Sequence, residues 1–500
     1  MKILLVNPAS TDTFWGLKNS LKFISKKAIL PPLGLLTVAA ILPANWDKRL
    51  VDMATAKLHD RDIFWADYVF ISAMAIQAES ARGVIERCKK LAKPIVAGGP
   101  LFTAAPEDYD DVDHLVLNEA EITLPVFLEE LKNGSAKHIY KSDKWTDMQD
   151  SPNPLWHLAK KNHYAVMPIQ YSRGCPFNCD FCNVTVLFGR NIRTKTAGQI
   201  LAELESLYSL GWRGPVFFVD DNFIAGRKKL KTEILPALIS WMKKRKYPFS
   251  FNTQCSVNLA DDEQLMRLMA QAGFDCVFIG IETVDEQSLI ECNKVQNQDR
   301  NLVESVRKIQ RFGMEVQGGF ILGFDSDKAS VFDNLTGFIE KSGIVTAMVG
   351  LLNAPRGTRL HQRLRNENRL LKDSSGDNTD FSTNFIPMMG RRELIEGYQK
   401  VVGTIYSNKF YYERVLRFLK NYRPLPKSGP GRGFSGFKAL VKSIWHLGIL
   451  SKGRVYYWKL LLWSLAHPKY LDKSIRLAIY GFHFRKVFAD CVSPMTNQTP

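Results

Sequence analysis

The sequence predicts an α/β protein in three parts: an N-terminal doubly wound parallel domain, a partial barrel of six strand–helix units, and a C-terminal basic helical region. Two stretches, from the amino terminus to about Leu131 and from Val166 to about Leu352, alternate short apolar segments with helical ones, as parallel sheets do. A proline-rich break separates them. The chain is 500 residues long with a net charge of +17, and most of that excess lies near its end.

The first part is expected to form a Rossmann-like sheet of five strands, at residues 3–6, 49–51, 68–72, 94–97 and 114–117. In such a sheet the ligand crevice lies beyond the carboxyl ends of the strands. Ser72, Gly98 and Gly99 stand at those ends, and glycine there allows a ligand to approach the backbone closely. No GxGxxG follows the first strand, which disfavours a dinucleotide.

The run at 150–154 contains Pro152 and Pro154 and interrupts both helix and strand. We therefore expect an N-terminal domain at 1–150, a linker at 151–165, a barrel domain at 166–370 and a helical region at 371–500. The expected barrel strands lie at 167–171, 216–219, 249–253, 276–281, 315–321 and 347–352. Parallel barrels assemble their active sites on the loops that follow such strands.

The loop after the first barrel strand carries Cys175, Cys179 and Cys182 in a CxxxCxxC pattern. Three thiolates can hold three irons of a cubane cluster and leave the fourth iron open for a ligand that is not protein. A catalytic zinc site and a group of buried thiols are the alternatives. The remaining cysteines form no such motif and are expected in the core: Cys88, Cys255, Cys276, Cys292 and Cys491.

This motif, with Phe181 just before its last cysteine, resembles the signature of the radical S-adenosylmethionine (SAM) superfamily. The resemblance implies a [4Fe-4S] cluster whose open iron chelates SAM, and cleavage of SAM to a 5'-deoxyadenosyl radical. Segments after later strands resemble SAM-binding motifs of the superfamily and contain Asp220, Asp221, Asn222 and, near the expected ribose, Glu282. Paired acids after a strand can instead cap the next helix.

Arg193 follows the cysteine loop closely. A cation there could stabilise the anionic cluster or a SAM carboxylate through charge-assisted hydrogen bonds, or it could belong to an ordinary solvated turn. We nominate no catalytic general base.

In the first part, the run at 31–35, the Gly98-Gly99 turn, and Glu119 with Glu121 resemble cobalamin-binding domains found ahead of radical SAM barrels. The resemblance implies that Ser72, Gly98 and Gly99 contact cobalamin. The DxHxxG motif for a histidine ligand to cobalt is absent after the first strand. A sheet kept only as a scaffold, with glycines serving tight turns, is the alternative.

Residues 406–486 contain seventeen Lys and Arg against two acids. Basic helices with an aromatic and leucine face suit peripheral contact with an anionic membrane surface; RNA binding and a solvated helical face are the alternatives. The interleaved aromatic residues are Trp445, Tyr456, Tyr457, Trp458, Trp463 and Phe482. Residues 424–436, rich in Pro, Gly and Lys, are expected to form a mobile linker.

Over nearly its full length the chain resembles cobalamin-dependent radical SAM enzymes with a helical C-terminal extension, the subgroup of the hopanoid C-2 methylases. The resemblance implies methyl transfer from methylcobalamin to an unactivated carbon of an apolar substrate, with a flavodoxin- or ferredoxin-type electron donor. Radical cyclisation without methyl transfer, and a non-catalytic iron–sulfur or corrinoid carrier, are the alternatives. Nucleic acid is disfavoured because the first 150 residues contain one cysteine, whereas radical SAM methylthiotransferases that act on tRNA carry three there.

Eight cysteines in 500 residues are too sparse for a disulfide framework. The amino-terminal apolar run is too short for a signal peptide. A cytoplasmic protein is expected, peripheral at the inner face of the membrane if the basic region makes contact there.

Overall fold

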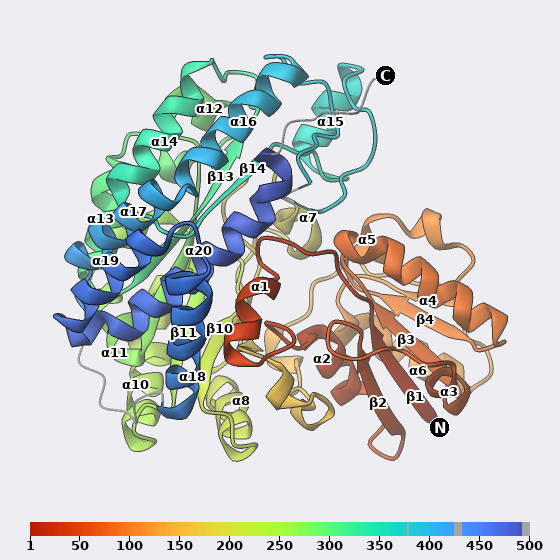
Figure 1. Ribbon diagram of the computed structural model, residues 1–500. Coiled ribbons are helices and arrows are strands. Elements are labelled where there is room, and N and C mark those ends of the chain that lie inside the picture. Colours follow the sequence, from red (N-terminus) through yellow and green to blue (C-terminus); the bar gives the residue numbers. More distant parts are fainter. Residues whose placement is uncertain (378–379, 425–432, 493–500) are drawn as a thin grey trace.

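Two parallel sheets and a helical layer make up the computed structural model, which describes residues 1–377, 380–424 and 433–492 (Figure 1). The first sheet has the order β2-β1-β3-β4-β5-β6, with every pair parallel. Its strands are β1 (Lys2–Asn7), β2 (Asp47–Asp52), β3 (Tyr68–Ser72), β4 (Ile95–Gly98), β5 (His114–Val116) and β6 (Ile139–Tyr140). The five predicted strands are confirmed. Strand β6 was not predicted, because two residues are too few to show a periodic pattern.

Helices cover both faces of this sheet. Leu35 of α2 (Leu33–Ile41) and Phe127 of α6 (Ala120–Lys132) share one apolar core with Leu5 of β1. On the other face α3 (Asp60–Trp65), α4 (Ala78–Lys90) and α5 (Pro100–Ala104) contribute to a second core. The strand order reverses direction between β1 and β3, and this switch point places the ligand crevice at their carboxyl ends.

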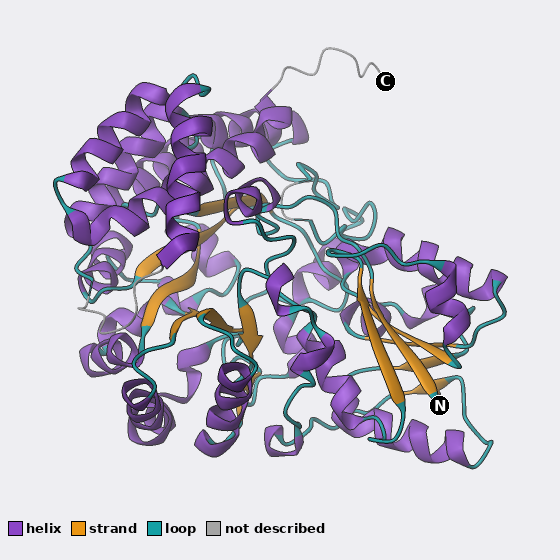
Figure 2. Ribbon diagram, turned by 60° about the horizontal axis from the view of Figure 1, so that its bottom comes forward, coloured by secondary structure: helices purple, strands orange, loops and turns teal. Residues whose placement is uncertain are grey.

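The second sheet is an open barrel with the order β14-β13-β12-β11-β10-β7, again parallel throughout. Its strands are β7 (Met167–Ile169), β10 (Gly214–Phe218), β11 (Phe249–Cys255), β12 (Phe274–Glu282), β13 (Glu315–Leu322) and β14 (Ala347–Leu351). All six predicted strands are confirmed. Figure 2 shows the two sheets side by side with helices around them; those outside the barrel include α8 (Ala197–Ser209), α10 (Leu235–Lys244), α11 (Glu263–Ala272), α13 (Leu302–Arg311) and α14 (Ser330–Ser342).

Burial alternates along the barrel strands. In β12, Val277, Ile279 and Ile281 are buried in the core between sheet and helices. Phe278 and Gly280, which lie between them, are only partly buried. Because successive side chains of a strand point to opposite faces, these two residues line the inner face of the barrel.

The C-terminal region packs against one side of the barrel (Figure 1). It comprises α15 (Arg359–Asn366), α16 (Arg391–Ile405), α17 (Asn408–Asn421), α18 (Gly433–Ser443), a π-helical turn (Ile444–Ile449), α19 (Arg454–Leu465) and α20 (Leu471–Val492). Arg414 of α17 is fully buried in an ion pair with Glu340 of α14, and Lys473 of α20 lies 2.9 Å from Glu315 of β13. The basic region is therefore partly folded into the barrel wall.

Helix α20 also contacts the segment that follows β1. The rings of Phe14 and Phe484 stack at 4.2 Å, and His483 Nε2 lies 3.1 Å from the carbonyl oxygen of Phe14. Helix α20 and the segment after β1 thus hold the N-terminal domain against the rest of the protein.

Most of the linker predicted at 424–436 lies outside the described residues, and its last four residues already belong to α18, which begins at Gly433. No helix in the described ranges is both long enough and apolar enough to cross a bilayer.

Candidate active site between the two sheets

The three cysteines lie on a loop that is pinned at both ends. The loop leaves β8 (Ser172–Arg173) and returns through α7 (Val184–Phe188) to β9 (Arg193–Thr194), which pairs antiparallel with β8. This small ribbon was not predicted. Gly174 precedes the first cysteine with φ +94°, and a Cβ there would lie 2.6 Å from the carbonyl oxygen of Asn191. Only glycine fits this approach of the two strands.

The thiols of Cys175, Cys179 and Cys182 are free, and Cys179 is buried. Burial raises the pKa of all three thiols, that of Cys182 to about 12, while the nearby ammonium of Lys294 opposes the shift. Iron binding would displace the thiol protons. In the part of the chain that the structure describes, no three His, Cys, Asp or Glu side chains are placed to hold a metal ion. Cluster ligation by these three cysteines therefore stays a prediction, supported by their place on one loop beside a buried cation.

Lys294 is the cation at this site, and no sequence pattern distinguishes it from the other lysines. Its Nζ lies 2.6 Å from Glu282 Oε1, and both side chains are about nine-tenths buried. Burial alone lowers the pKa of Lys294, but the carboxylate of Glu282 outweighs it and raises that pKa above its usual value. The pair therefore carries its two charges beside the cysteines.

The backbone at Glu282 is constrained to present this carboxylate. Glu282 has φ +63°, a left-handed conformation unusual for a side chain of its size, and the register of β12 against β13 shifts between Gly280 and Glu282. A Cβ at Gly280 would lie 2.2 Å from Glu282 Oε1 and 2.9 Å from Lys294 Nζ. Gly280 is required for the ion pair to lie over the strand.

Two amides next to Lys294 were also missed by the sequence reasoning. Gln296 Nε2 lies 3.9 Å from Cys179 Sγ, while its buried Oε1 has no partner. Asn297 donates to the carbonyl oxygens of Gly280 and Ile281 at 3.1 and 2.9 Å, and its Oδ1 is likewise unpaired. A bound cofactor could donate hydrogen bonds to these two buried acceptors beside the cysteine loop.

Asp220 and Asn222 make hydrogen bonds to neighbouring segments of the barrel. The fully buried carboxylate of Asp220 accepts hydrogen bonds from the backbone of Tyr171 and from the amide and hydroxyl of Ser172, at the entry to the cysteine loop. Burial raises its pKa to about 7. Asn222 accepts from the amide of Ser256 at 3.2 Å. These contacts give both residues an architectural role, and their contact with SAM stays a prediction.

Asp221 differs from Asp220 and Asn222 because its carboxylate has fewer hydrogen-bond partners within the protein. It accepts from the amide of Gly174 at 3.4 Å, next to Cys175. Burial raises its pKa to about 6. Of the three residues predicted to contact SAM after β10, Asp221 is the one whose polar atoms lie beside the cysteine loop with a single weak hydrogen bond.

At the carboxyl ends of the first sheet, the predicted residues pack closely together. A Cβ at Gly98 would lie 2.5 Å from the carbonyl oxygen of Val116, and one at Gly99, where φ is +91°, would lie 2.6 Å from Ser72 Oγ. Close packing thus accounts for both glycines, and cobalamin contact through Ser72, Gly98 and Gly99 stays a prediction. Beside them Gln77 Nε2 donates to Asn7 Oδ1 at 3.2 Å.

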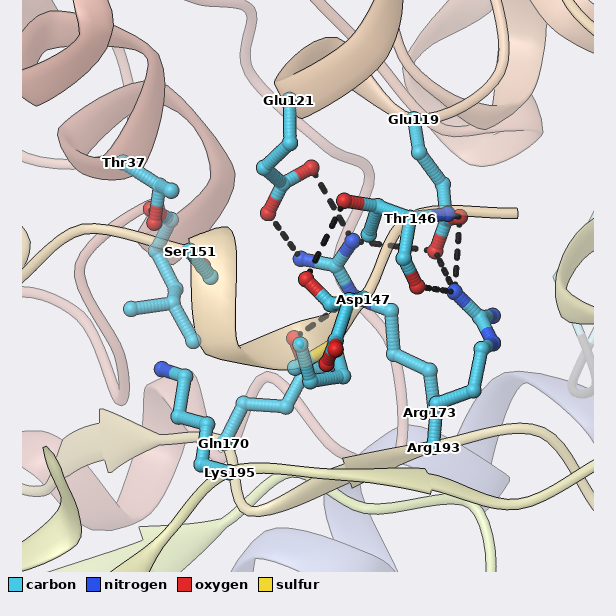
Figure 3. A network of polar contacts seen from close by, with 12 residues as sticks. Thr37, Glu119, Glu121, Thr146, Asp147, Ser151, Gln170, Arg173, Arg193 and Lys195 are labelled. Atoms are coloured by element: carbon cyan, nitrogen blue, oxygen red, sulfur yellow. Dashed lines mark hydrogen bonds and ion pairs between the residues drawn. The ribbon is translucent and has the colours of Figure 1, made fainter. Parts of the chain in front are cut away.

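Arg193 has partners other than the predicted ones. Its NH1 lies 2.8 Å from Glu119 Oε2 and 2.8 Å from the carbonyl oxygen of Thr146. Arg173, immediately before the cysteine loop, lies 3.0 Å from Glu119 and 2.8 Å from Glu121. Figure 3 shows these two arginines reaching from the barrel to the two glutamates of the N-terminal domain.

The four side chains form what we call the interdomain clamp: Glu119, Glu121, Arg173 and Arg193. Their exposed fractions are 2%, 4%, 12% and 14%, so the charges are almost wholly removed from water. Because Arg173 belongs to β8 and Arg193 to β9, the clamp holds both sides of the cysteine ribbon against the loop after β5 and the first turn of α6. The orientation of the ribbon toward the first sheet is thereby fixed.

A doubly wound domain whose crevice faces an open barrel, with three free cysteines on the barrel's first loop, defines a cobalamin-binding radical SAM enzyme. Family comparison agrees along the chain: residues 23–128 match the B12 binding domain, residues 169–335 match the radical SAM superfamily, and residues 358–497 match a domain of unknown function, DUF4070.

An uncharacterized methyltransferase of Synechocystis is 38% identical over 97% of this chain and 91% of its own length. The hopanoid C-2 methylase of Rhodopseudomonas palustris is 32% identical over 92% of this chain and 89% of its own. The chain belongs to this family of cobalamin-dependent radical SAM methyltransferases, which use a [4Fe-4S] cluster, SAM and cobalamin.

Solved structures agree on the fold. The cobalamin-dependent SAM radical enzyme OxsB, with aqua-cobalamin and SAM bound, superposes with a TM-score of 0.62 at 14% identity and covers 98% of this chain and 80% of its own. The radical SAM methyltransferase TsrM from Kitasatospora setae, with cobalamin and a [4Fe-4S] cluster bound, gives a TM-score of 0.57 at 14% identity over 75% of this chain and 76% of its own.

Proposed function

We propose that this enzyme methylates an unactivated carbon of an apolar, polycyclic isoprenoid of the hopanoid type. The cofactors, when bound, supply a 5'-deoxyadenosyl radical for hydrogen abstraction and a cobalt-bound methyl group. The protein's own contribution is to hold the cysteine loop, SAM and the substrate carbon in register with the first sheet and to exclude water from them.

The observation that carries the proposal is the uncharged inner face of the barrel. Phe278 lies on this face over Gly319, where a Cβ would come within 2.7 Å of its ring. Trp15, from the segment after β1, meets Phe278 edge to face at 5.4 Å and is 37% exposed. The partly buried residues at neighbouring central positions are also uncharged: Phe217, Asn252, Gln254, Gln317 and Met348.

Trp15 and Phe278 are placed to accept a rigid apolar body. Phe278 is four residues from Glu282 along β12, roughly 13 Å at about 3.3 Å per residue. A fused ring system of that length could reach from the aromatic pair toward the cysteine loop. Apolar contact without charged groups gives such a substrate affinity through burial of its surface, whereas an anionic metabolite would find no cation on this stretch of the described strand.

The residues near the cysteines and at the ends of the first sheet have separate tasks in this proposal. Lys294 neutralises the thiolates, and Glu282 holds the ammonium of Lys294 toward them. Asp221 and Glu282 are proposed to contact the SAM amino group and ribose. We propose Ser72, Gly98 and Gly99 as contacts of cobalamin, and Arg193 as a residue that acts through the interdomain clamp.

We further propose a flavodoxin- or ferredoxin-type reductant, a cytoplasmic location and peripheral contact of residues 406–486 with an anionic membrane, from which a lipid-like substrate could be drawn. The test is to incubate the reconstituted enzyme and reductant with methyl-labelled SAM and lipid extract. Label in a polycyclic lipid one carbon heavier is expected. Label found only in a soluble metabolite or in RNA would refute the substrate class.

Radical cyclisation is the second candidate. An anaerobic magnesium-protoporphyrin IX monomethyl ester cyclase of Rubrivivax gelatinosus is 25% identical over 37% of this chain. A product with altered ring count and no added carbon would favour it over methyl transfer.

A further inference from the structure

Large apolar side chains are exposed in one short stretch of the C-terminal region. Among the described residues, 24 large apolar side chains are exposed, and nine of them lie between Phe437 and Leu465. We call these nine the apolar helix surface: Phe437, Val441, Trp445, Ile449, Leu450, Val455, Trp458, Leu462 and Leu465. They belong to α18, the π-helical turn, α19 and the short connection between the turn and α19.

The nine residues follow helical spacing. Phe437, Val441 and Trp445 recur every four residues along α18 and into the π-helical turn, and Val455, Trp458 and Leu462 recur at intervals of three and four in α19. Residues three and four apart share one face of a helix, so each segment presents an apolar stripe to solvent. Their exposed fractions run from 38% for Trp458 to 71% for Val455.

Other side chains of the same helices anchor the stripes to each other and to the protein. Ser443 Oγ and Tyr457 OH lie 2.7 Å apart, and Trp458 Nε1 donates to the carbonyl oxygen of Gly448 at 2.9 Å. Lys442 Nζ donates to the carbonyl oxygen of Lys22, 2.7 Å away in the N-terminal domain. The surface is therefore a fixed part of the fold, whereas Tyr457 is buried and Trp463 and Phe482 are partly buried, so those aromatics are not free for a partner.

The charge around the apolar helix surface has one sign. Residues 433–471 contain six Lys and Arg and no Asp or Glu. Lys452, Arg454 and Lys459 are exposed beside Val455 and Trp458. A second copy of the chain docked by the same face would set these cations against their equals, which opposes a symmetric dimer.

RNA is a weaker fit than lipid for the same surface. Six of the nine residues are aliphatic and offer no ring on which a base could stack, which single-stranded nucleic acid requires. Aliphatic side chains with two tryptophans among them and cations beside them match the boundary between lipid headgroups and acyl chains.

We infer that the apolar helix surface inserts into the headgroup region of an anionic bilayer and docks the enzyme there. This gives a role to the region that matches the domain of unknown function, and it deepens the peripheral membrane contact proposed above. Insertion buries the apolar stripes, while the exposed Lys452, Arg454 and Lys459 pair with lipid phosphates.

The test is flotation of the full-length protein with vesicles of phosphatidylglycerol and phosphatidylcholine, and with phosphatidylcholine alone. Binding to the anionic vesicles is expected, and it should weaken as salt rises. A variant carrying serine at four exposed surface positions should bind at least about tenfold less tightly, since each buried apolar side chain contributes to partitioning. The four substitutions are Phe437→Ser, Trp445→Ser, Leu462→Ser and Leu465→Ser.

The matched control carries serine at exposed apolar residues elsewhere: Phe64, Val126 and Ile290, which are 59%, 48% and 55% exposed. It should float like the unchanged protein. Because all these side chains are exposed, both variants should fold, and unchanged cleavage of SAM to 5'-deoxyadenosine under dithionite checks this.

Equal flotation of the two variants, or no binding by the unchanged protein, would overturn the inference. So would a dimer in solution that only the surface variant converts to monomers, or RNA competing for the same four residues. Flotation needs no substrate, so its failure leaves the methylation assay standing. Conversely, label in a soluble product would refute the substrate class without touching the docking result.

Discussion

Replacing Arg173 of the interdomain clamp by methionine tests whether the clamp fixes the cysteine ribbon. Arg173→Met removes the hydrogen bonds to Glu121 at 2.8 and 3.1 Å and the one to Glu119 at 3.0 Å. The carboxylates left behind are 2% and 4% exposed. Breaking a buried ion pair by removing one partner costs about 3–5 kcal/mol, and Arg193 still compensates Glu119, so a value near 3 kcal/mol is expected.

Hydrogen exchange is the assay suited to this change, because a protein of several domains has no single unfolding free energy. The Thr146 amide donates to Glu119 Oε2 at 2.7 Å and reports on the clamp directly. A local loss of about 3 kcal/mol speeds exchange there roughly 150-fold, at 1.4 kcal/mol per factor of ten. Peptides from α11, remote from the clamp, serve as the internal control.

The double variant Arg173→Met with Glu121→Leu separates charge from packing. Replacing both members of a buried pair by apolar residues is often nearly neutral, so protection at Thr146 should largely return. If the two changes instead add, or if the single variant exchanges less than about fivefold faster, the clamp is not held by charge pairing. The single variant is also expected to transfer methyl groups more slowly while it retains its iron–sulfur absorbance.

The pH dependence of the Arg173→Met defect is an independent check on charge pairing in the clamp. Burial alone raises the pKa of Glu121, yet the guanidinium of Arg173 outweighs it and leaves the pKa below its usual 4.5. A carboxyl with a lowered folded pKa adds stability above its unfolded pKa and loses it as the pH falls through the folded one. Without Arg173, burial should raise the pKa, so the variant's defect should shrink as the pH falls from 7 toward 5.

Three further changes have defined outcomes. Cys179→Ala should abolish the iron–sulfur absorbance of the reconstituted protein. Cys255→Ala, which removes a buried thiol of the barrel core, should retain it. Absorbance retained in both variants would refute the cubane assignment. Gly280→Ala places a Cβ 2.2 Å from Glu282 Oε1 and should destabilise the protein by about 1–3 kcal/mol through overpacking. SAM binding measured by calorimetry should weaken at least tenfold. Unchanged binding would remove the Glu282–Lys294 pair from the SAM site. Burial raises the pKa of Asp220 to about 7, so Asp220 binds its proton more tightly in the folded state and local stability should fall as the pH rises from about 4 to 7. Asp220→Asn should flatten that slope in hydrogen exchange of the Tyr171 and Ser172 amides, which donate to Asp220, after correction for the intrinsic pH dependence of exchange. A slope that persists would contradict the shift.

Local patterns were sufficient to predict most of the fold. Strand positions followed from short apolar runs, and a run such as residues 68–72 coincides with β3 (Tyr68–Ser72) because burial on both faces requires uninterrupted apolar residues. The cysteine motif was equally local, since all three thiols lie within eight residues and one loop can position them. Strands β6 and β8 escaped because two residues show no period.

The tertiary structure alone decided which distant side chains meet. Lys294 pairs with Glu282, the last residue of β12 and 12 residues earlier in the chain, and Arg193 pairs with Glu119, 74 residues away, where the sequence suggested a cluster or SAM partner. Exposure was likewise undetermined: Tyr457 and Trp458 are neighbours in an apolar run, yet one is buried and the other exposed. Periodicity shows that a helix has an apolar face, but only the packing of α19 against its neighbours determines how much of that face remains for a partner.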